Sequence, residues 1–273
     1  MLQKIEQTTA YIRQCVNFNP EIGIILGTGL GALVNEIDTI ATLEYKDIPN
    51  FPISTVQGHS GKLVFGMLGG KKVVAMQGRF HYYEGYTMQQ VTFPVRVMKA
   101  LGIKLLVVSN ASGGMNPTFK VGDIMVIRDH INLFGTNPLI GPNCDELGPR
   151  FPEMSEAYDK RYIKLAFEIA EQNNIHLQKG VYIGVTGPTF ETPSEYKFFH
   201  IAGADAVGMS TVPEIIVARH MKVPCFAVSV ITDLGITGVV EKVSHEEVQQ
   251  AANKAEPKMT LLIKKMIESI VEF

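Results

Sequence analysis

Arg79, His81 and Glu84 lie within six residues of each other, in a segment that follows a predicted strand. Arginine offers a planar fork of donors and histidine adds another, a combination that suits an oxyanion such as phosphate. Glu84 is placed three residues beyond His81, where it could orient or protonate the imidazole. A surface turn with a salt bridge is the alternative. The position directly after a strand favours the anion site.

A second group of polar residues interrupts a predicted strand–helix–strand unit over residues 180–214. Pro193 opens the helix, where a missing N–H does no harm, and Gly203 closes it. Residues 190–192 (Phe-Glu-Thr) precede the helix, and residues 209–211 (Met-Ser-Thr) follow the second strand. Ligands of open α/β sheets bind at the carboxyl ends of strands, so both points are candidate site positions.

Three further positions are candidates on weaker signals. Residues 27–31 (Gly-Thr-Gly-Leu-Gly) follow an apolar strand, and such a turn lets backbone N–H groups approach an anion. The spacing is not that of a dinucleotide fingerprint, and a tight structural turn explains it equally well. His59 lies between glycines in a loop, where a histidine is commonly just exposed. The apolar strand 224–231 ends in Thr232 and Asp233, and the carboxyl end of a strand is a good place for a catalytic or base-reading carboxylate.

Strand and helix patterns alternate along the chain, which predicts an α/β fold in a single domain around a largely parallel sheet. A run of small residues at 109–117 follows the apolar strand 105–108 and would let a ligand touch the main chain. Residues 129–150 are predicted to be a long irregular segment. The other expected elements are a helix over 2–16, a helix from the glycine-rich turn to Ile37, a hairpin over 62–77, a strand over 123–127, and helices over 87–101, 159–172, 213–221 and from Ser244 onward.

Composition excludes several classes of function. The 273 residues carry a net charge of −2, which gives no electrostatic case for binding nucleic acid or an anionic membrane. The three cysteines are far apart and offer neither a disulfide framework nor a zinc spacing. The first residues lack an apolar signal core, and no apolar run is long enough for a bilayer. We expect a soluble cytoplasmic protein that binds no metal.

An ordered set of motifs resembles the trimeric purine nucleoside phosphorylases. The motifs are GTGLG, GHSG, GRFHYYEGY, SNASGGMNP, FPEMSEAYD, GPTFETPSE, GADAVGMSTVPE and SHEEV. Singly they are unspecific, but their order over residues 21–247 is highly specific. The resemblance implies one phosphorylase domain over residues 1–273, with a mixed sheet flanked by helices. It also implies a homotrimer, no cofactor, and a reaction of purine (deoxy)ribonucleosides with phosphate, which is a co-substrate, to give free base and pentose 1-phosphate.

The resemblance also implies roles for individual residues. Phosphate would be bound by Thr28, His59, Arg79, His81, Asn110, the backbone at Ala111, and Ser210. The ribose would contact Tyr83, Met209 and His245, together with Phe151 reaching in from a neighbouring subunit. The purine would be held by Phe190, Glu191, Val207, Gly208 and Asp233. The catalytic set would be His81, Glu84, Glu191 and Asp233.

These residue types suit cleavage of an N-glycosidic bond. The reaction builds positive charge on the sugar and negative charge on the departing purine. Phosphate is itself the nucleophile, so positioning and electrostatics should dominate over covalent catalysis by the protein. An ionised Glu191 can accept a hydrogen bond from N1–H of a 6-oxopurine such as hypoxanthine or guanine.

Asp233 departs from the family pattern, because the 6-oxopurine enzymes usually have asparagine there. An ionised aspartate can only accept, as it would from the 6-amino group in the related methylthioadenosine phosphorylases. A protonated Asp233 could instead donate to N7 of the leaving purine, and two nearby carboxylates would favour one shared proton. The Phe-Glu-Thr motif at 190–192 favours the second interpretation, and hence inosine and guanosine as substrates.

Three alternatives stay open at this stage. A methylthioadenosine or methylthioinosine phosphorylase is the first, although His245 suits a 5′-hydroxyl better than a 5′-methylthio group. A non-catalytic binding protein on the same fold is the second, and Arg79, His81, Glu191 and Ser210 argue against it. A hydrolase that uses water in place of phosphate is the third.

Overall fold

The computed structural model describes residues 1–28, 31–53, 55, 60–235 and 244–273. In this part of the chain, nine strands form a mixed sheet in the order β2-β3-β4-β1-β5-β8-β7-β6-β9. The strands are β1 (Ile22–Leu26), β2 (Asp38–Glu44), β3 (Lys62–Leu68), β4 (Lys71–Gln77), β5 (Leu105–Gly114), β6 (Ile124–Asn132), β7 (Leu177–Gly184), β8 (Ala206–Gly208) and β9 (Cys225–Leu234).

The strand β5 organises the sheet. It pairs in parallel with β1 on one edge and with β9 along most of its length, and its last residues pair with β8. Since β9 also pairs with β6, the strands β5, β8, β7, β6 and β9 close into a small ring. Leu105, Leu106, Val107 and Val108 are fully buried, as expected of a strand covered on both faces.

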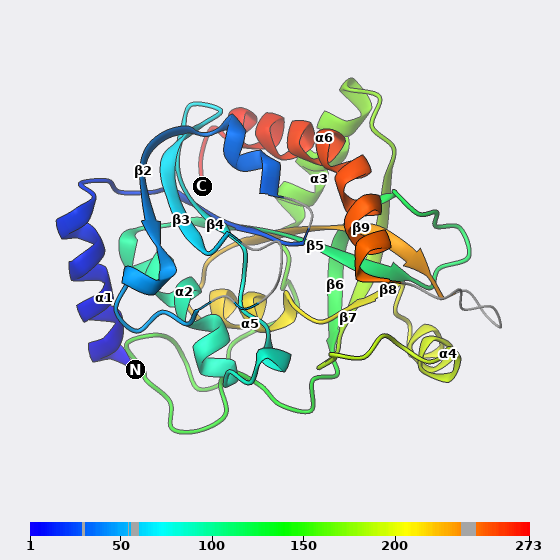
Figure 1. The fold of residues 1–273 in the computed structure, drawn as a ribbon, viewed down its shortest axis with the longest axis horizontal. Helices are drawn as coiled ribbons and strands as arrows, with labels where there is room; N and C mark the ends of the chain where they lie inside the picture. Colours follow the sequence, from blue (N-terminus) through cyan, green and yellow to red (C-terminus); the bar gives the residue numbers. More distant parts are fainter. Residues whose placement is uncertain (29–30, 54, 56–59, 236–243) are drawn as a thin grey trace.

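Helices cover both faces of the sheet. The helices are α1 (Leu2–Cys15), α2 (Met88–Leu101), α3 (Lys160–Gln172), α4 (Pro193–Ile201), α5 (Val212–His220) and α6 (His245–Ser269). The helices α3 and α6 lie together on one side, α2 and α5 pack against each other on the other side, and α1 packs on α2 (Figure 1). The short helix α4 lies beyond the ends of β7 and β8 (Figure 1). This arrangement confirms the α/β fold with a mixed sheet flanked by helices.

Three local expectations were wrong. Residues 109–114, expected to follow the strand 105–108, are the second half of β5, because β9 and β8 supply their backbone partners. The expected place of Asp233 at the carboxyl end of its strand is confirmed, because β9 ends at Leu234. Residues 129–132, assigned to an irregular segment, continue β6, and a 3₁₀ helix (Gly31–Glu36) replaces the expected helix after the glycine-rich turn. The strand β2 was not predicted, because it is an edge strand with no buried residue and no strict alternation.

Candidate active site

A pocket lies where the carboxyl halves of β5, β8 and β9 meet. Its empty volume, counted to its open mouth, is about 690 Å³. Residues from seven parts of the chain line it: Gly27, Thr28, Arg79, His81, Tyr83, Asn110, Ala111, Ser112, Gly113, Phe190, Glu191, Val207, Gly208, Met209, Ser210, Thr232, Asp233, His245 and Val248. The size is that of a small-molecule site.

The fold therefore brings together most of the site residues expected from the sequence. Fourteen of them line this one pocket: Thr28, Arg79, His81, Tyr83, Asn110, Ala111, Phe190, Glu191, Val207, Gly208, Met209, Ser210, Asp233 and His245. Glu84 stands behind His81, and Phe151 lies elsewhere on the surface. His59 lies outside the described residues. Which of these groups contacts phosphate, sugar or base remains a prediction.

Local capping chemistry places two of the site segments. Thr192 and Glu195 form a capping box at the start of α4, which fixes Phe190 and Glu191 just before the helix. Ser244 and Glu247 form another at the start of α6, so that His245 is its first residue. These pairs are readable in the sequence, because a Thr or Ser is followed three residues later by Glu.

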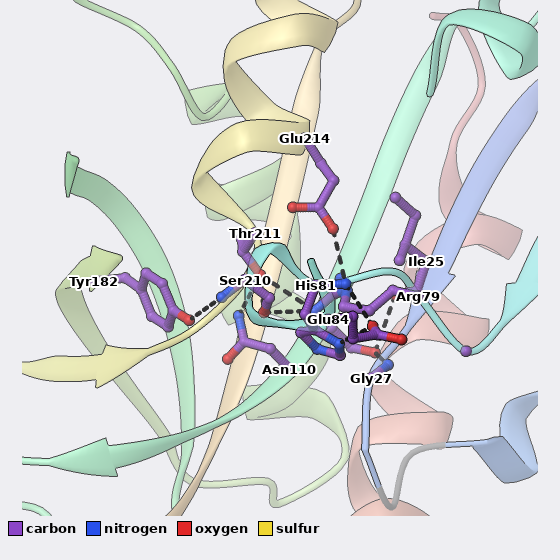
Figure 2. A network of polar contacts seen from close by, with 12 residues as sticks. Ile25, Gly27, Arg79, His81, Glu84, Asn110, Tyr182, Ser210, Thr211 and Glu214 are labelled. Carbon is purple, nitrogen blue, oxygen red and sulfur yellow. Dashed lines mark hydrogen bonds and ion pairs between the residues drawn. The ribbon is translucent and has the colours of Figure 1, made fainter. Parts of the chain in front are cut away.

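Arg79 is held by a buried network (Figure 2). Its Nε lies 3.2 Å from Glu214 Oε1, with both side chains almost wholly buried. Its Nη1 donates to Ser210 Oγ at 2.9 Å and to Thr211 Oγ1 at 3.4 Å. The guanidinium is thus fixed in the pocket wall by a carboxylate on one side and two hydroxyls on the other, a preorganised cation for an anionic ligand.

His81 is oriented by Glu84 (Figure 2). The imidazole Nδ1 lies 3.1 Å from Glu84 Oε1, and the backbone N–H of His81 donates to the same oxygen at 2.7 Å. Burial lowers the pKa of His81 against the opposing effect of Glu84, so the ring is neutral at neutral pH. Burial opposes the charge of Glu84, but hydrogen bonds from His81 and Thr55 hold its pKa down to about 2. An ionised Glu84 therefore accepts from Nδ1–H, which directs Nε2 away from it.

Substitution of Glu84 by glutamine tests this orientation. The amide removes the charged acceptor for Nδ1–H, and loss of a hydrogen bond to a charged group corresponds to about a 10- to 100-fold effect. We expect the KM for phosphate to rise by about tenfold or more, with little change in the KM for the nucleoside. Steady-state kinetics with each substrate varied in turn measures the two values. An equal rise in both would indicate general disruption of the pocket.

Asn110 is fixed by hydroxyls on both sides. Its Nδ2 donates to Thr211 Oγ1 at 2.8 Å, and its Oδ1 accepts from Ser229 Oγ at 2.5 Å. Thr211 has a φ of 70°, which is strained for a β-branched residue and places its side chain between Asn110 and Arg79. Sequence reasoning did not assign a role to Thr211, Ser229 or Glu214. Only the contacts in the folded chain reveal these roles. In the sequence, Glu214 is an ordinary acidic residue in the first turn of α5.

Two carboxyl groups face the other polar part of the pocket. Burial raises the pKa of Asp233, and burial together with the charge of Asp233 raises the pKa of Glu191 to about 7. Asp233 Oδ2 accepts from the Tyr196 hydroxyl at 2.8 Å, and Oδ1 accepts from Thr232 Oγ1 at 2.9 Å. Tyr196 is a further residue that sequence reasoning missed. The raised pKa of both acids supports one proton held within the pair.

The pKa of Glu191 has a consequence for stability. A carboxyl whose pKa is higher in the folded chain binds more protons there, so its contribution to stability falls as pH rises from about 4.5 to about 7. Replacement of Glu191 by glutamine removes this pH-dependent contribution to the free energy of unfolding. We expect the variant to be more stable than the parent at pH 8 by up to about 3 kcal/mol, and to show no such gain at pH 5. Chemical denaturation at fixed protein concentration measures both, and an equal difference at the two pH values would contradict the assignment.

Phe151 lies outside the pocket, with 87% of its surface exposed. It borders a separate hollow together with Ile140, Pro152 and Met154. A large aromatic residue so exposed is available to a second molecule. Its predicted role in a neighbouring subunit remains a proposal.

Two negative observations apply to the described residues alone. They contain no group of three or more His, Cys, Asp or Glu side chains placed to hold a metal ion. Among the helices described, none is long and apolar enough to cross a membrane.

Comparison with known proteins shows the family to which the chain belongs. The model of the Phosphorylase superfamily matches residues 21–268. Purine nucleoside phosphorylase 1 of Bacillus subtilis is 52% identical over 98% of both chains. The solved structure of Schistosoma mansoni purine nucleoside phosphorylase with adenosine has a TM-score of 0.94 at 44% identity, and covers 99% of this chain and 98% of its own. The same Schistosoma enzyme with inosine gives a TM-score of 0.93 at 43% identity, with coverage of 99% and 98%. The chain therefore belongs to the phosphorylase superfamily and, within it, to the purine nucleoside phosphorylases, which are pentosyltransferases.

Proposed function

We propose that this chain catalyses the phosphorolysis of 6-oxopurine (deoxy)ribonucleosides, inosine and guanosine, to free purine and (deoxy)ribose 1-phosphate. One observation carries the proposal: a buried, preorganised Arg79 and a pair of carboxyl groups with raised pKa line the same pocket. The Schistosoma enzyme, whose solved structures contain inosine and hypoxanthine, supports the choice of base.

Phosphate binds on the Arg79 side of the pocket. The guanidinium, His81 and the hydroxyls of Thr28 and Ser210 supply donors, and the main chain at Ala111 and the amide of Asn110 add to them. His59 is proposed as a further phosphate ligand. The phosphate oxygen attacks C1′ as the glycosidic bond breaks, and the dianion stabilises the positive charge that develops on the sugar.

The sugar lies between phosphate and base. Met209 presents an apolar surface to the ribose, which leaves the phosphate free of competing donors. Tyr83 contacts the ribose, and His245 is proposed to bind the 5′-hydroxyl.

The purine is held by Phe190, Val207, Gly208 and the two acids. An ionised Glu191 accepts from N1–H of the 6-oxopurine, and a protonated Asp233 transfers its proton to N7 as the bond to C1′ breaks. Neutralising the leaving group in this way lowers the barrier to departure. Both steps need one proton on the pair, which the raised pKa of both acids supports.

Substitution of Asp233 by asparagine tests the proton donor. Asparagine keeps a hydrogen bond to the base but has no proton to transfer, and general acid catalysis typically contributes about 10²- to 10⁴-fold. We expect kcat for inosine to fall by about 10²-fold or more at unchanged phosphate KM. Turnover of inosine at the parent rate or faster would show that Asp233 is not the acid.

A second function has one observation in its favour. Both oxygens of Asp233 accept hydrogen bonds, from Tyr196 and from Thr232, and an ionised Asp233 would accept a further one from a 6-amino group. The alternative is therefore a 5′-methylthioadenosine or methylthioinosine phosphorylase with a preference for 6-aminopurines. A strong preference for adenosine over inosine would select it.

The proposal extends to assembly and cellular role. We infer a homotrimer of single domains spanning residues 1–273, in which Phe151 completes the sugar site of a neighbour, and its exposure supports this. We also propose a cytoplasmic enzyme of purine salvage whose co-substrate is inorganic phosphate and which needs no cofactor. Light scattering on the purified chain tests the trimer.

A further inference from the structure

A chain of hydrogen bonds links the strands β5 and β9 to the turn before α5. Ser112 Oγ lies 2.6 Å from Ser229 Oγ, and Ser229 Oγ donates to Asn110 Oδ1 at 2.5 Å. Asn110 Nδ2 in turn donates to Thr211 Oγ1 at 2.8 Å, and Thr211 Oγ1 lies 3.2 Å from Ser210 Oγ. We call this series of side chains the hydroxyl chain.

The hydroxyl chain is buried along its whole length. Ser229 and Thr211 are fully buried, and none of its other members is more than 9% exposed. Water therefore competes little for these donors and acceptors, and each group takes its partners from its neighbours. The direction in which each hydroxyl donates can then be found by counting protons and lone pairs.

The count fixes the direction at Ser229. A serine hydroxyl has one proton to donate and two lone pairs that accept. Ser229 uses its proton on Asn110 Oδ1, so its contact with Ser112 is one in which it accepts. The Ser112 hydroxyl is therefore the donor at the start of the chain.

The count also fixes the direction at the other end, beside Arg79 (Figure 2). Thr211 Oγ1 accepts from Asn110 Nδ2 and from Arg79 Nη1, which occupies both of its lone pairs. Its own proton therefore goes to Ser210 Oγ. Ser210 Oγ also accepts from Arg79 Nη1 at 2.9 Å, so its remaining hydrogen-bonding group is its O–H, which is left for a ligand of the pocket.

We propose that Ser229 is a positioning residue for phosphate: it sets the direction of the hydroxyl chain, so that Asn110 and Ser210 both present protons to the phosphate site. This inference rests on the function proposed above, which places phosphate beside these two residues. Ser229 is not among the described residues that line the pocket, so it acts through Asn110. The amide of Asn110 has a second N–H besides the one given to Thr211, and the side chain lines the pocket.

A reversed amide shows why this direction matters. If the Asn110 oxygen faced Thr211, the threonine would spend its proton on that oxygen, and Ser210 would no longer receive it. Ser210 could then donate back to Thr211, and its proton would be lost to phosphate. The Asn110 carbonyl oxygen would also replace an N–H on the side of the anion. The Ser229 proton on Oδ1 opposes this reversal, because it stabilises the oxygen on the far side from Thr211.

The test is calorimetric titration of inorganic phosphate into the intact protein, which needs no turnover. Ser229→Ala removes the donor to Asn110 Oδ1, and we expect phosphate to bind about tenfold more weakly, because a buried acceptor loses its partner. Ser229→Cys, whose thiol is a weak donor, should lose only about threefold. Thr92→Val is the control: it removes a buried hydroxyl that donates within α2 to Met88, and should change the affinity less than about twofold.

Two comparisons separate the direction of the chain from general support of the pocket. In an Asn110→Ala background the chain is already broken, so Ser229→Ala should cause no further loss of phosphate affinity. Ser112→Ala leaves the Ser229 donor in place, and should weaken phosphate binding less than about threefold. Unchanged affinity in Ser229→Ala, equal losses in Ser112→Ala and Ser229→Ala, or full additivity with Asn110→Ala would overturn the proposal. If Ser229→Ala does not fold, Ser229→Cys in both backgrounds makes the same comparison.

Failure of the inference differs from failure of the proposed function. Phosphate-dependent cleavage of inosine by the parent enzyme, combined with unchanged phosphate affinity in Ser229→Ala, would reject the positioning role alone. Absence of that cleavage would reject the proposed function, while the phosphate titrations would still test Ser229.

Discussion

Replacement of Arg79 by alanine is expected to lower kcat/KM for inosine phosphorolysis by about 10³-fold. Arg79 is 1% exposed and held in the pocket wall by Glu214, Ser210 and Thr211. A fixed cation in a site with little water stabilises charge far more than the same cation in solvent. Its removal also leaves the buried Glu214 carboxylate without the Arg79 cation beside it, and this negative charge would disfavour the proposed phosphate dianion nearby.

The size of this loss distinguishes phosphorolysis from hydrolysis. In steady-state kinetics with the phosphate concentration varied, most of the loss in Arg79→Ala should appear as a lower kcat/KM for phosphate. Arg79→Lys, which keeps the charge but not the planar fork, should recover part of the activity. If Arg79→Ala cleaves inosine at nearly the parent rate, and that rate does not depend on phosphate concentration, then water is the nucleophile. That result would contradict phosphorolysis.

The second large effect is expected at Glu214. Replacement by glutamine leaves Arg79 as a buried charge without its carboxylate, and breaking a buried pair in this way costs about 3–5 kcal/mol. We expect the variant without phosphate to unfold at lower denaturant concentration than the parent. Phosphate binds the folded state and supplies the missing negative charge, so it should stabilise the variant more than the parent.

Denaturation of both proteins with and without saturating phosphate measures this difference. Glu247→Gln is a suitable control, because that carboxylate caps the exposed start of α6 and has no contact with Arg79 among the described residues. If phosphate does not reduce the loss of stability in Glu214→Gln, then Glu214 supports the fold but does not position the Arg79 guanidinium for phosphate.

The main catalytic side chains could be predicted from sequence, because they lie directly after strands or before a helix. Arg79 and His81 follow β4, and Glu191 precedes a helix whose cap is visible in the sequence. Their meeting in one pocket depends on the order of strands, which local patterns do not contain. The resemblance to a family supplied the grouping of these residues in one site, and the strand order itself came only from the structure.

Other features depend on contacts that no local pattern reveals. Residues 109–114 are small and polar, which is typical of loops, yet pairing with β8 and β9 makes them a strand. Tyr196 occupies a helix position that reads as core, and only its approach to Asp233 across 37 residues reveals a polar role. Glu214 lies 135 residues beyond Arg79, so its pairing is a product of the fold.

The most direct test of the account is release of purine from inosine, adenosine and 5′-methylthioadenosine, each with and without phosphate. We expect phosphate-dependent release of hypoxanthine from inosine, with adenosine cleaved much more slowly. Preferential cleavage of adenosine or its methylthio analogue would instead make Asp233 an ionised acceptor during turnover. No release from any of the three in the presence of phosphate would contradict the proposed function.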